Sequence, residues 1–266
     1  MCTVTFVPRN DGFYVVMNRD ERIARPAASP PAVFRQELVE SIYPLDSEGG
    51  TWVAANRTGV AFALLNWNDT KVLYQKKRTR GSVIPALLST TCDHAAESAL
   101  RRLDLDGILP FRLVGIFPAE ERVIEWHWDQ KSIQRNIFSW TLRQWCSSSL
   151  SDAMATATRK QVLKQRLTEC HTGSLTWLRQ LHSSHDDSRT GFSHCVHRQE
   201  VQTVSYTELV FSGQGIACNY LAGNPCNKDE TLHRVSLPRL FAGMQPEGSS
   251  TLIVNNSRSS FVSSPV

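Results

Sequence analysis

Apolar and polar residues alternate in short stretches along the chain, and this two-residue period predicts β-strands. The first stretch, residues 2–7, reads Cys-Thr-Val-Thr-Phe-Val, and residues 13–17 follow it across a turn at residues 8–12. Residues 23–50 contain four prolines and predict irregular structure. Further strands are predicted at residues 51–55, 60–66, 111–117, 122–128, 192–198, 202–211 and 215–221.

A helical period replaces this pattern in the middle of the chain. Residues 93–103 and 152–169 carry apolar residues toward one side, and a shorter helix is predicted near residues 174–182. Strands near both ends with helices between them indicate an α+β protein built in layers. From about residue 227 serines crowd the chain, so we expect one domain at residues 1–226 and a flexible tail at 227–266.

Composition and charge exclude several classes of function. A hydrophobic content of 41% is enough for a core, and 29 Lys+Arg against 25 Asp+Glu give a net charge of +4, too mild to indicate nucleic-acid binding. No apolar run of about 18 residues predicts a transmembrane segment, and no secretory signal is recognised. Seven cysteines without a C-x-x-C pair suit a reducing compartment, so we expect the cytoplasm or an organelle matrix.

One local run of positive charge stands out against this mild average. Lys76, Lys77 and Arg78 are consecutive, and Arg80 follows. A solvated loop is the first interpretation of this run, and a site for an anionic ligand is the second.

The opening hairpin places a cysteine beside a charged run. Opposite residues of an antiparallel hairpin have a nearly constant sum of positions, which is about 20 to 22 for a turn centred near residues 10–11. Cys2 is therefore expected opposite a position between Asn18 and Asp20, within the run Asn-Arg-Asp-Glu at residues 18–21.

Cysteine at position 2 is small enough for the initiator methionine to be removed, which would leave a thiol and a free α-amine on one residue. An α-amine titrates near ~7.7–8 and can act as a base at neutral pH. Arg19 is the candidate cation that favours the thiolate of Cys2, and Asp20 or Glu21 could orient the amine or Arg19. The plain alternative is an exposed N-terminus followed by a solvated turn.

A larger set of short motifs makes this arrangement more specific. It comprises Met1-Cys2-Thr3, Asn18-Arg19-Asp20-Glu21, Arg25-Pro26, Gly49-Gly50-Thr51-Trp52, Gly59 with Leu65-Asn66, Arg80-Gly81, residues 145–150 and residues 203–207. With these motifs the chain resembles the NRDE family, which includes the transport and Golgi organization protein 2. The resemblance covers about residues 1–226. Members of this family have been linked to haem movement and to lipid or acyl-CoA handling, so the resemblance implies a role of this kind.

The start of the chain is also distantly similar to bile-salt and penicillin-V amidases. This resemblance implies a four-layer αββα sandwich of the N-terminal-nucleophile hydrolase type, in which a terminal cysteine attacks an amide carbonyl. It implies Cys2 as the nucleophile, Arg19 as the cation that tunes the thiol and Asp20 as the partner of the amine. Asn66 would stabilise the tetrahedral oxyanion.

The sequence departs from the amidase pattern at several places. The amidases space their charged pair as Arg-x-x-Asp, so without a gap Asn18 falls on the Arg and Glu21 on the Asp. A second Asn of the amidases falls in residues 147–149, which are all serines. Asn18, Glu21 and Ser148 are therefore accessory candidates. A late Arg of the amidases falls near Gln202.

Two other groups of residues were considered as binding sites. His194-Cys195-x-His197 has ligand chemistry, but no second pair at suitable spacing is evident, so we expect no metal site. Trp126 and Trp128 are expected to pack in the core or to line an apolar groove.

Three hypotheses of function follow from the sequence. The first is a cysteine hydrolase or acyltransferase that acts on a small amide or acyl thioester and needs no cofactor. The second is a non-catalytic carrier of haem or another amphipathic, lipid-like ligand. The third is an interaction partner in membrane trafficking.

Overall fold

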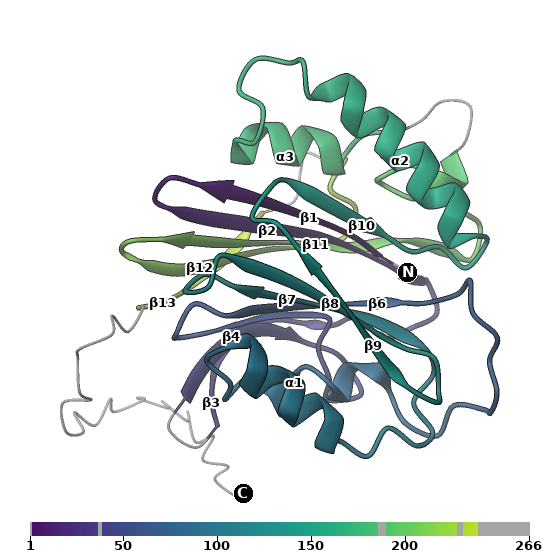
Figure 1. Ribbon diagram of the computed structural model, residues 1–266. Helices are drawn as coiled ribbons and strands as arrows, with labels where there is room; N and C mark the ends of the chain where they lie inside the picture. The colour runs from purple at the N-terminus through teal and green to yellow at the C-terminus, as the bar shows by residue number, and fades with distance from the viewer. Residues whose placement is uncertain (1, 37–38, 186–189, 228–230, 239–266) are drawn as a thin grey trace, which may run out of the picture.

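Two antiparallel β-sheets stack face to face, and helices cover the outer face of each sheet (Figure 1). The computed structural model describes residues 2–36, 39–185, 190–227 and 231–238. In these ranges the chain forms a four-layer αββα sandwich, which confirms the fold class predicted from the sequence.

The first sheet has the strand order β10-β1-β2-β11-β12-β13. Its strands are β1 (Cys2–Arg9), β2 (Gly12–Arg22), β10 (Arg143–Cys146), β11 (Val201–Ser212), β12 (Gly215–Ala222) and β13 (His233–Leu237). Cys2 pairs with Arg19 across β1 and β2, a sum of 21, so the predicted register of the hairpin is confirmed.

The second sheet follows the order of the chain, β3-β4-β5-β6-β7-β8-β9. Its strands are β3 (Ser29–Gln36), β4 (Val39–Leu45), β5 (Val53–Asn56), β6 (Ala61–Asn66), β7 (Phe111–Phe117), β8 (Arg122–Trp128) and β9 (Ile133–Phe138).

The helices divide between the two outer faces of the sandwich. They are α1 (Asp93–Arg102), α2 (Asp152–Arg166) and α3 (Leu175–His182), with the short 3-10 turns η1 (Arg80–Ser82), η2 (Pro85–Leu87) and η3 (Thr190–Phe192). In Figure 1, α2 and α3 lie over the first sheet and α1 lies over the second. None of the described helices is long and apolar enough to cross a membrane.

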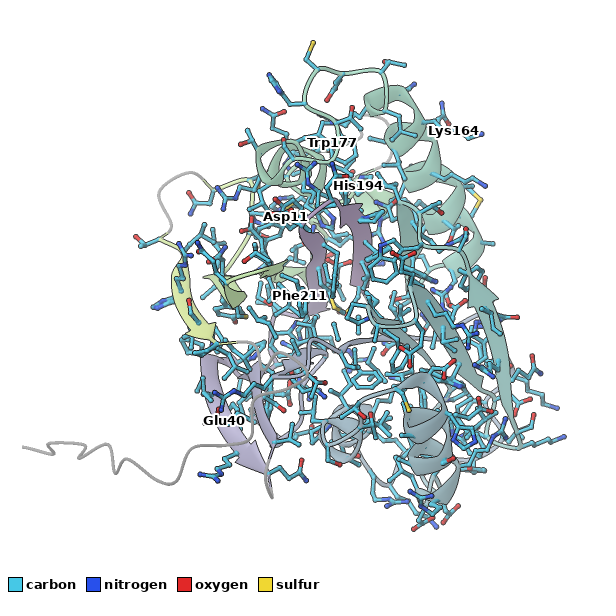
Figure 2. All side chains as sticks on the ribbon, turned by 60° about the vertical axis from the view of Figure 1, so that its left-hand side comes forward. Asp11, Glu40, Lys164, Trp177, His194 and Phe211 are labelled. Carbon is cyan, nitrogen blue, oxygen red and sulfur yellow. The ribbon has the colours of Figure 1, made fainter. Side chains whose placement is uncertain are left out.

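Three apolar cores hold the four layers together. The core between the sheets includes a stacked pair, Phe13 and Phe211, with ring centroids 3.9 Å apart. A second core joins the second sheet to α1, and a third, which contains Trp177, joins the first sheet to α2 and α3. Figure 2 shows Phe211 and Trp177 in the interior, whereas Lys164 points away from α2. The inter-sheet core also holds Cys2, so the start of β1 is anchored by packing.

Some elements differ from the sequence-based expectations for identifiable reasons. Residues 23–50 contain β3 and β4, because Pro30 and Pro31 lie on β3, an edge strand where a missing N–H is tolerated. Residues 192–198 were predicted as a strand but form a buried irregular segment with one bridge, between His197 and Gln202. The strands β9 and β10 were not predicted.

A short part of the expected tail is an ordered strand. Residues 233–237, which the sequence analysis assigned to the tail, form β13 and pair with β12 from Ile216 to Tyr220. The first sheet therefore extends beyond residue 226. The remaining tail, residues 239–266, lies outside the described residues.

Two buried histidines make the stability of this fold depend on pH. His182 is fully buried, accepts or donates hydrogen bonds at both ring nitrogens with Asn18 and Thr5, and its burial lowers its pKa to about 3. The folded state thus binds fewer protons than the unfolded state between the unfolded pKa near ~6.5 and the folded value. Burial also lowers the pKa of His194.

We expect the free energy of unfolding to be fully retained above about pH 6.5 and to fall as the pH is lowered, by up to about 1.4 kcal/mol per pH unit for each such histidine. His182→Gln should reduce this slope, as measured by urea denaturation at several pH values, with His194 maintaining the rest. The exposed His94 provides the control, because His94→Gln should leave the slope unchanged. An equal slope in His182→Gln and the parent protein would contradict the assignment.

Candidate active site

A cavity of about 470 Å³ opens where the ends of β1, β2 and β6 meet the segment before η1. Its charged lining comprises six cationic and four acidic side chains: Arg19, Arg22, Arg25, Lys76, Arg78, Arg80, Asp20, Glu21, Asp46 and Glu200. Cys2 and Asn66 also line it, beside Trp52. Charged residues thus make up half of the lining residues of the cavity, and cations are in excess.

Cys2 is fixed at the beginning of β1 by two hydrogen bonds to one residue. Its backbone nitrogen donates to Ser147 Oγ at 2.9 Å, and Ser147 N donates to the Cys2 carbonyl at 2.9 Å. The side chain is 6% exposed. Burial raises the pKa of the Cys2 thiol, and the charge of Arg19 acts in the opposite direction. The structure thus gives the nitrogen of Cys2 a hydroxyl partner that the sequence analysis did not assign.

Arg19 lies directly opposite Cys2 and is held by groups from the second sheet. Its Nη2 donates to Asp46 Oδ2 at 2.5 Å, and its guanidinium lies 4.5 Å from the centre of the Trp52 ring. Although burial opposes it, hydrogen bonds from Arg25 and the Glu48 backbone hold the pKa of Asp46 below its usual value. Asp46 is therefore an ionised anchor for Arg19, and sequence reasoning missed it.

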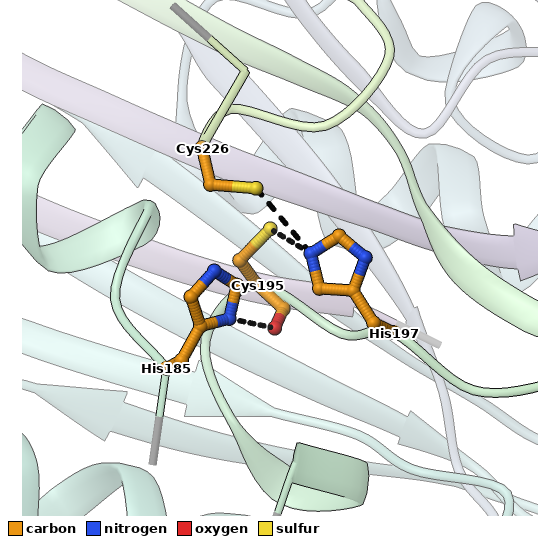
Figure 3. A group of neighbouring side chains, drawn as sticks. All are labelled: His185, Cys195, His197 and Cys226. Carbon is orange, nitrogen blue, oxygen red and sulfur yellow. Dashed lines mark hydrogen bonds between the residues drawn. The ribbon is translucent and has the colours of Figure 1, made fainter. Parts of the chain in front are cut away.

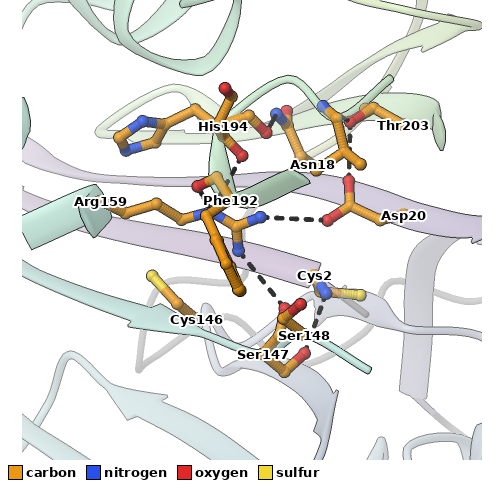
Figure 4. A network of polar contacts seen from close by, with 12 residues as sticks. Cys2, Asn18, Asp20, Cys146, Ser147, Ser148, Arg159, Phe192, His194 and Thr203 are labelled. Carbon is orange, nitrogen blue, oxygen red and sulfur yellow. Dashed lines mark hydrogen bonds and ion pairs between the residues drawn. The ribbon is translucent and has the colours of Figure 1, made fainter. Parts of the chain in front are cut away.

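Asp20 faces the opposite side of β2, toward the helices. Thr203 Oγ1 donates to Asp20 Oδ1 at 2.7 Å, and Arg159 Nη2 lies 3.5 Å from Asp20 Oδ2 (Figure 4). The register of β11 against β2 shifts between Thr203 and Ser205, a bulge that aligns Thr203 with Asp20. Asp20 and Arg159 are both 1% exposed, so this ion pair is shielded from water.

Arg159 of α2 connects this carboxylate to the segment that holds Cys2. Its Nε donates to the carbonyls of Phe192 and Ser193 at 3.2 and 3.1 Å, and its Nη1 donates to the Ser147 carbonyl at 3.4 Å (Figure 4). Arg159 was not a sequence candidate. Its burial on the inner side of α2 is visible in the structure, whereas the sequence shows only an arginine within the predicted helix 152–169.

Asn66 ends β6 and is oriented by Arg80. Arg80 Nη1 donates to Asn66 Oδ1 at 2.9 Å, and Arg80 Nε donates to the Pro110 carbonyl at 2.9 Å. With its oxygen occupied, the amide of Asn66 retains Nδ2 as a donor to the cavity. Burial lowers the pKa of Arg80 to about 10, and within the described ranges no carboxylate forms an ion pair with it. Lys76, Lys77 and Arg78 are exposed and pair with surface carboxylates, as a solvated loop would, whereas Arg80 is half-buried and lines the cavity.

A close approach of two backbones brings Arg80 to this place. A Cβ on Gly50 would lie 2.6 Å from the carbonyl carbon of Gly81, so no larger residue fits there without displacement. Thr51 N donates to the Gly81 carbonyl at 3.1 Å across this contact. The pair of glycines therefore sets the distance between η1 and the turn before β5.

The three accessory candidates lie in different environments. Asn18 faces α3 and donates to the carbonyls of His182 and His194 at 2.9 and 2.7 Å, away from the cavity. Glu21 lines the cavity, 3.5 Å from Arg19. Ser148 is buried, and its backbone nitrogen donates to Asp152 Oδ1 at 2.6 Å. Cys2, Arg19, Glu21 and Asn66 thus line one cavity, and Asn18 and Ser148 do not. Asp20 also borders the cavity, but its carboxylate oxygens contact Thr203 and Arg159 on the helix side of β2.

Two solved structures have a similar fold. Penicillin V acylase from Agrobacterium tumefaciens aligns with a TM-score of 0.53 at 8% identity, covering 89% of this chain and 86% of that chain. The C2A mutant of conjugated bile acid hydrolase from Clostridium perfringens aligns with a TM-score of 0.51 at 10% identity, covering 89% and 92%. At such low identity the likeness shows the fold, the αββα sandwich of N-terminal-nucleophile hydrolases.

Sequence comparison assigns the family. A search of curated proteins returns no match. Residues 1–209, more than half of the chain, match the family described as Transport and Golgi organisation 2. This agrees with the resemblance carried by the opening motifs, and the chain belongs to the Transport and Golgi organisation 2 family.

Proposed function

We propose that this protein is a cysteine amidohydrolase or acyltransferase whose substrate is a small amide or acyl thioester with an anionic group. The observation that carries the proposal is that the Cys2 thiol, the Asn66 amide and the Arg80 guanidinium line one cavity. A nucleophile, an oxyanion donor and a binding cation are the parts that acyl transfer requires.

The reaction begins after removal of Met1, when Cys2 carries a free α-amine. The amine takes the thiol proton as Sγ attacks the carbonyl carbon, and the resulting oxyanion receives a hydrogen bond from Asn66 Nδ2. The amine returns the proton to the departing nitrogen, leaving a thioester on Cys2. Water, deprotonated by the amine, then releases the acid and restores the thiol. Ser147 Oγ, at 2.9 Å from the Cys2 nitrogen, orients the amine.

Arg80 supports an anionic substrate class. The guanidinium of Arg80 is half-buried and forms no ion pair with a carboxylate among the described residues, an arrangement that an anionic ligand would stabilise. The neighbouring Lys76 and Arg78 are satisfied by Glu48 and Asp104 at 3.3 and 3.0 Å. The fold neighbours are named as a penicillin V acylase and a conjugated bile acid hydrolase.

The polar lining favours this function over haem carriage. Trp52, Leu64, Leu109 and Val201 line the cavity with apolar side chains, whereas ten of its lining residues are charged. No histidine of the described ranges lines it. A flat apolar macrocycle would bury these charges without matching them, which is unfavourable.

The first prediction concerns Cys2 itself. We expect the intact mass of the purified protein to lack Met1, and we expect Cys2→Ser to lower kcat by a factor on the order of 10³ or more on any amide that the parent hydrolyses. Serine at position 2 still permits removal of Met1, so this variant changes the nucleophile alone. The assay detects released amine from N-acylglycines, penicillin V and a glycine-conjugated bile acid.

The exposed Cys170 is the matched control, because Cys170→Ser changes a thiol remote from the cavity. It should hydrolyse the same amides at the parental rate. Retention of Met1 in the active protein, or equal kcat in Cys2→Ser and the parent, would rule out the N-terminal nucleophile.

The second prediction separates the oxyanion donor from the anion-binding residue. Asn66→Ala should lower kcat by about 10²- to 10³-fold on every substrate, because it removes an oxyanion donor. Arg80→Gln should raise KM for N-acylglycines by about 10- to 100-fold, the scale of one lost charged hydrogen bond. For matching N-acylethylamines, which lack the carboxylate, KM should change little.

Arg102 on the surface of α1 offers a control of equal charge. Arg102→Gln should reproduce the parental kcat and KM, which excludes a general effect of net charge. If Arg80→Gln changed KM equally for the anionic and the neutral amides, the proposed recognition of an anion would be wrong.

A further inference from the structure

Four potential metal ligands converge on the helix side of the first sheet, outside the cavity of Cys2. They are His185 after α3, Cys195 and His197 before β11, and Cys226 after β12. One ligand atom from each residue lies within 4.8 Å of all the others (Figure 3). None of the four residues lines the cavity described above, so the proposed acyl-transfer chemistry does not account for them.

The spacing of these atoms matches a tetrahedral site. With Zn–S near 2.3 Å and Zn–N near 2.0–2.1 Å, the S···N edge of a tetrahedron is about 3.6 Å. His197 Nε2 lies 3.5 Å from Cys195 Sγ and 3.3 Å from Cys226 Sγ. The widest separation, 4.8 Å, exceeds such an edge by about 1 Å, so small side-chain shifts close the set.

Backbone contacts preorganise two of the ligands. His185 Nδ1 lies 3.2 Å from the Cys195 carbonyl, so this nitrogen donates a proton and leaves Nε2 with a lone pair. In Figure 3 the other ring nitrogen of His185 lies on the side of the sulfur atoms. Cys195 N donates to the Ser184 carbonyl at 3.1 Å, which joins the loop after α3 to the segment before β11. A hydrogen bond of this kind fixes the tautomer of a metal-binding histidine.

We propose that His185, Cys195, His197 and Cys226 bind one zinc-type divalent cation in a Cys₂His₂ site. Two thiolates and two imidazoles are the donor set of closed structural zinc sites. All four coordination positions come from the protein, so the ion holds the structure together and carries no reaction step.

The proposed ion would join three chain segments that are far apart in the sequence. It would also stabilise the segment that positions Asp20 beside the cavity of Cys2. Val196 N donates to Thr203 Oγ1 at 2.8 Å, and the same hydroxyl donates to Asp20 Oδ1 at 2.7 Å. Cys195 and His197 flank Val196. Fixing them therefore fixes the hydroxyl that orients Asp20.

The sequence analysis expected no metal because two of the four ligands are isolated. Cys195-x-His197 stood out, but His185 and Cys226 are single residues on other segments, with no local pattern. The fold brings them together because the end of α3 and the end of β12 both lie beside the start of β11.

The test measures metal binding by the full chain, prepared without an affinity tag and dialysed against metal-free buffer. Mass spectrometry of the metal content should give about one zinc per chain after addition of equimolar Zn²⁺ and removal of excess. Co²⁺ in place of Zn²⁺ should give the visible d–d bands of a tetrahedral ion and a thiolate charge-transfer band. Cys226→Ser and His197→Gln should each weaken Zn²⁺ affinity by at least tenfold.

Cys170 and His171 form an exposed matched control on the surface. The double variant Cys170→Ser/His171→Asn should bind Zn²⁺ like the parent. If a ligand variant fails to fold, the exposed His185→Gln and the Co²⁺ spectrum of the parent decide the question. The proposal is overturned by less than one-tenth of an equivalent of zinc in the parent, by an octahedral Co²⁺ spectrum, or by a Cys195–Cys226 disulfide in place of two titratable thiols.

Discussion

Burying a carboxylate that is 1% exposed is costly unless a cation lies beside it, and this requirement organises the protein around Asp20. The carboxylate comes from the first sheet and its cation, Arg159, comes from α2, so one ion pair fixes the helix layer against the sheet. The remaining donors of Arg159 hold the carbonyls of Phe192, Ser193 and Ser147. Ser147 in turn accepts a hydrogen bond from the nitrogen of Cys2, so the ion pair of Asp20 and Arg159 helps to fix Cys2 through Ser147.

Strand periodicity and turn chemistry were sufficient to predict most of the two sheets. The strands Phe111–Phe117 and Arg122–Trp128 begin and end where the pattern places them, because each has a clear apolar face and a short polar turn. The edge strand β3 was not predicted because its prolines resemble those of a loop, and only the position at an edge makes them tolerable. Residues 193–196 are buried like a strand but form no ladder beyond the single bridge at His197, and a local sequence pattern cannot distinguish such a segment from a strand.

The part of the candidate site that lies within the first hairpin was predictable from the sequence. Hairpin register alone brings Arg19 opposite Cys2. Successive residues of a strand face opposite sides, so a run of four polar residues cannot all point at one thiol, and Asn18 and Asp20 turn toward the helices. Asp46 and Arg159, which hold Arg19 and Asp20, lie 27 and 139 positions away from these partners. Contacts over such separations depend on the assembled layers and leave no local signature.

Arg80 both donates a hydrogen bond to the amide of Asn66 and lines the cavity with its positive charge. In an enzyme built this way, the choice of substrate charge and the readiness of the oxyanion donor are not independent properties. A relative that lost this arginine to admit neutral amides would also release the Asn66 side chain to rotate. Under the proposed function, broadening the range of substrates would require a paired change, in which a second residue takes over the hydrogen bond to Asn66 before the arginine is replaced.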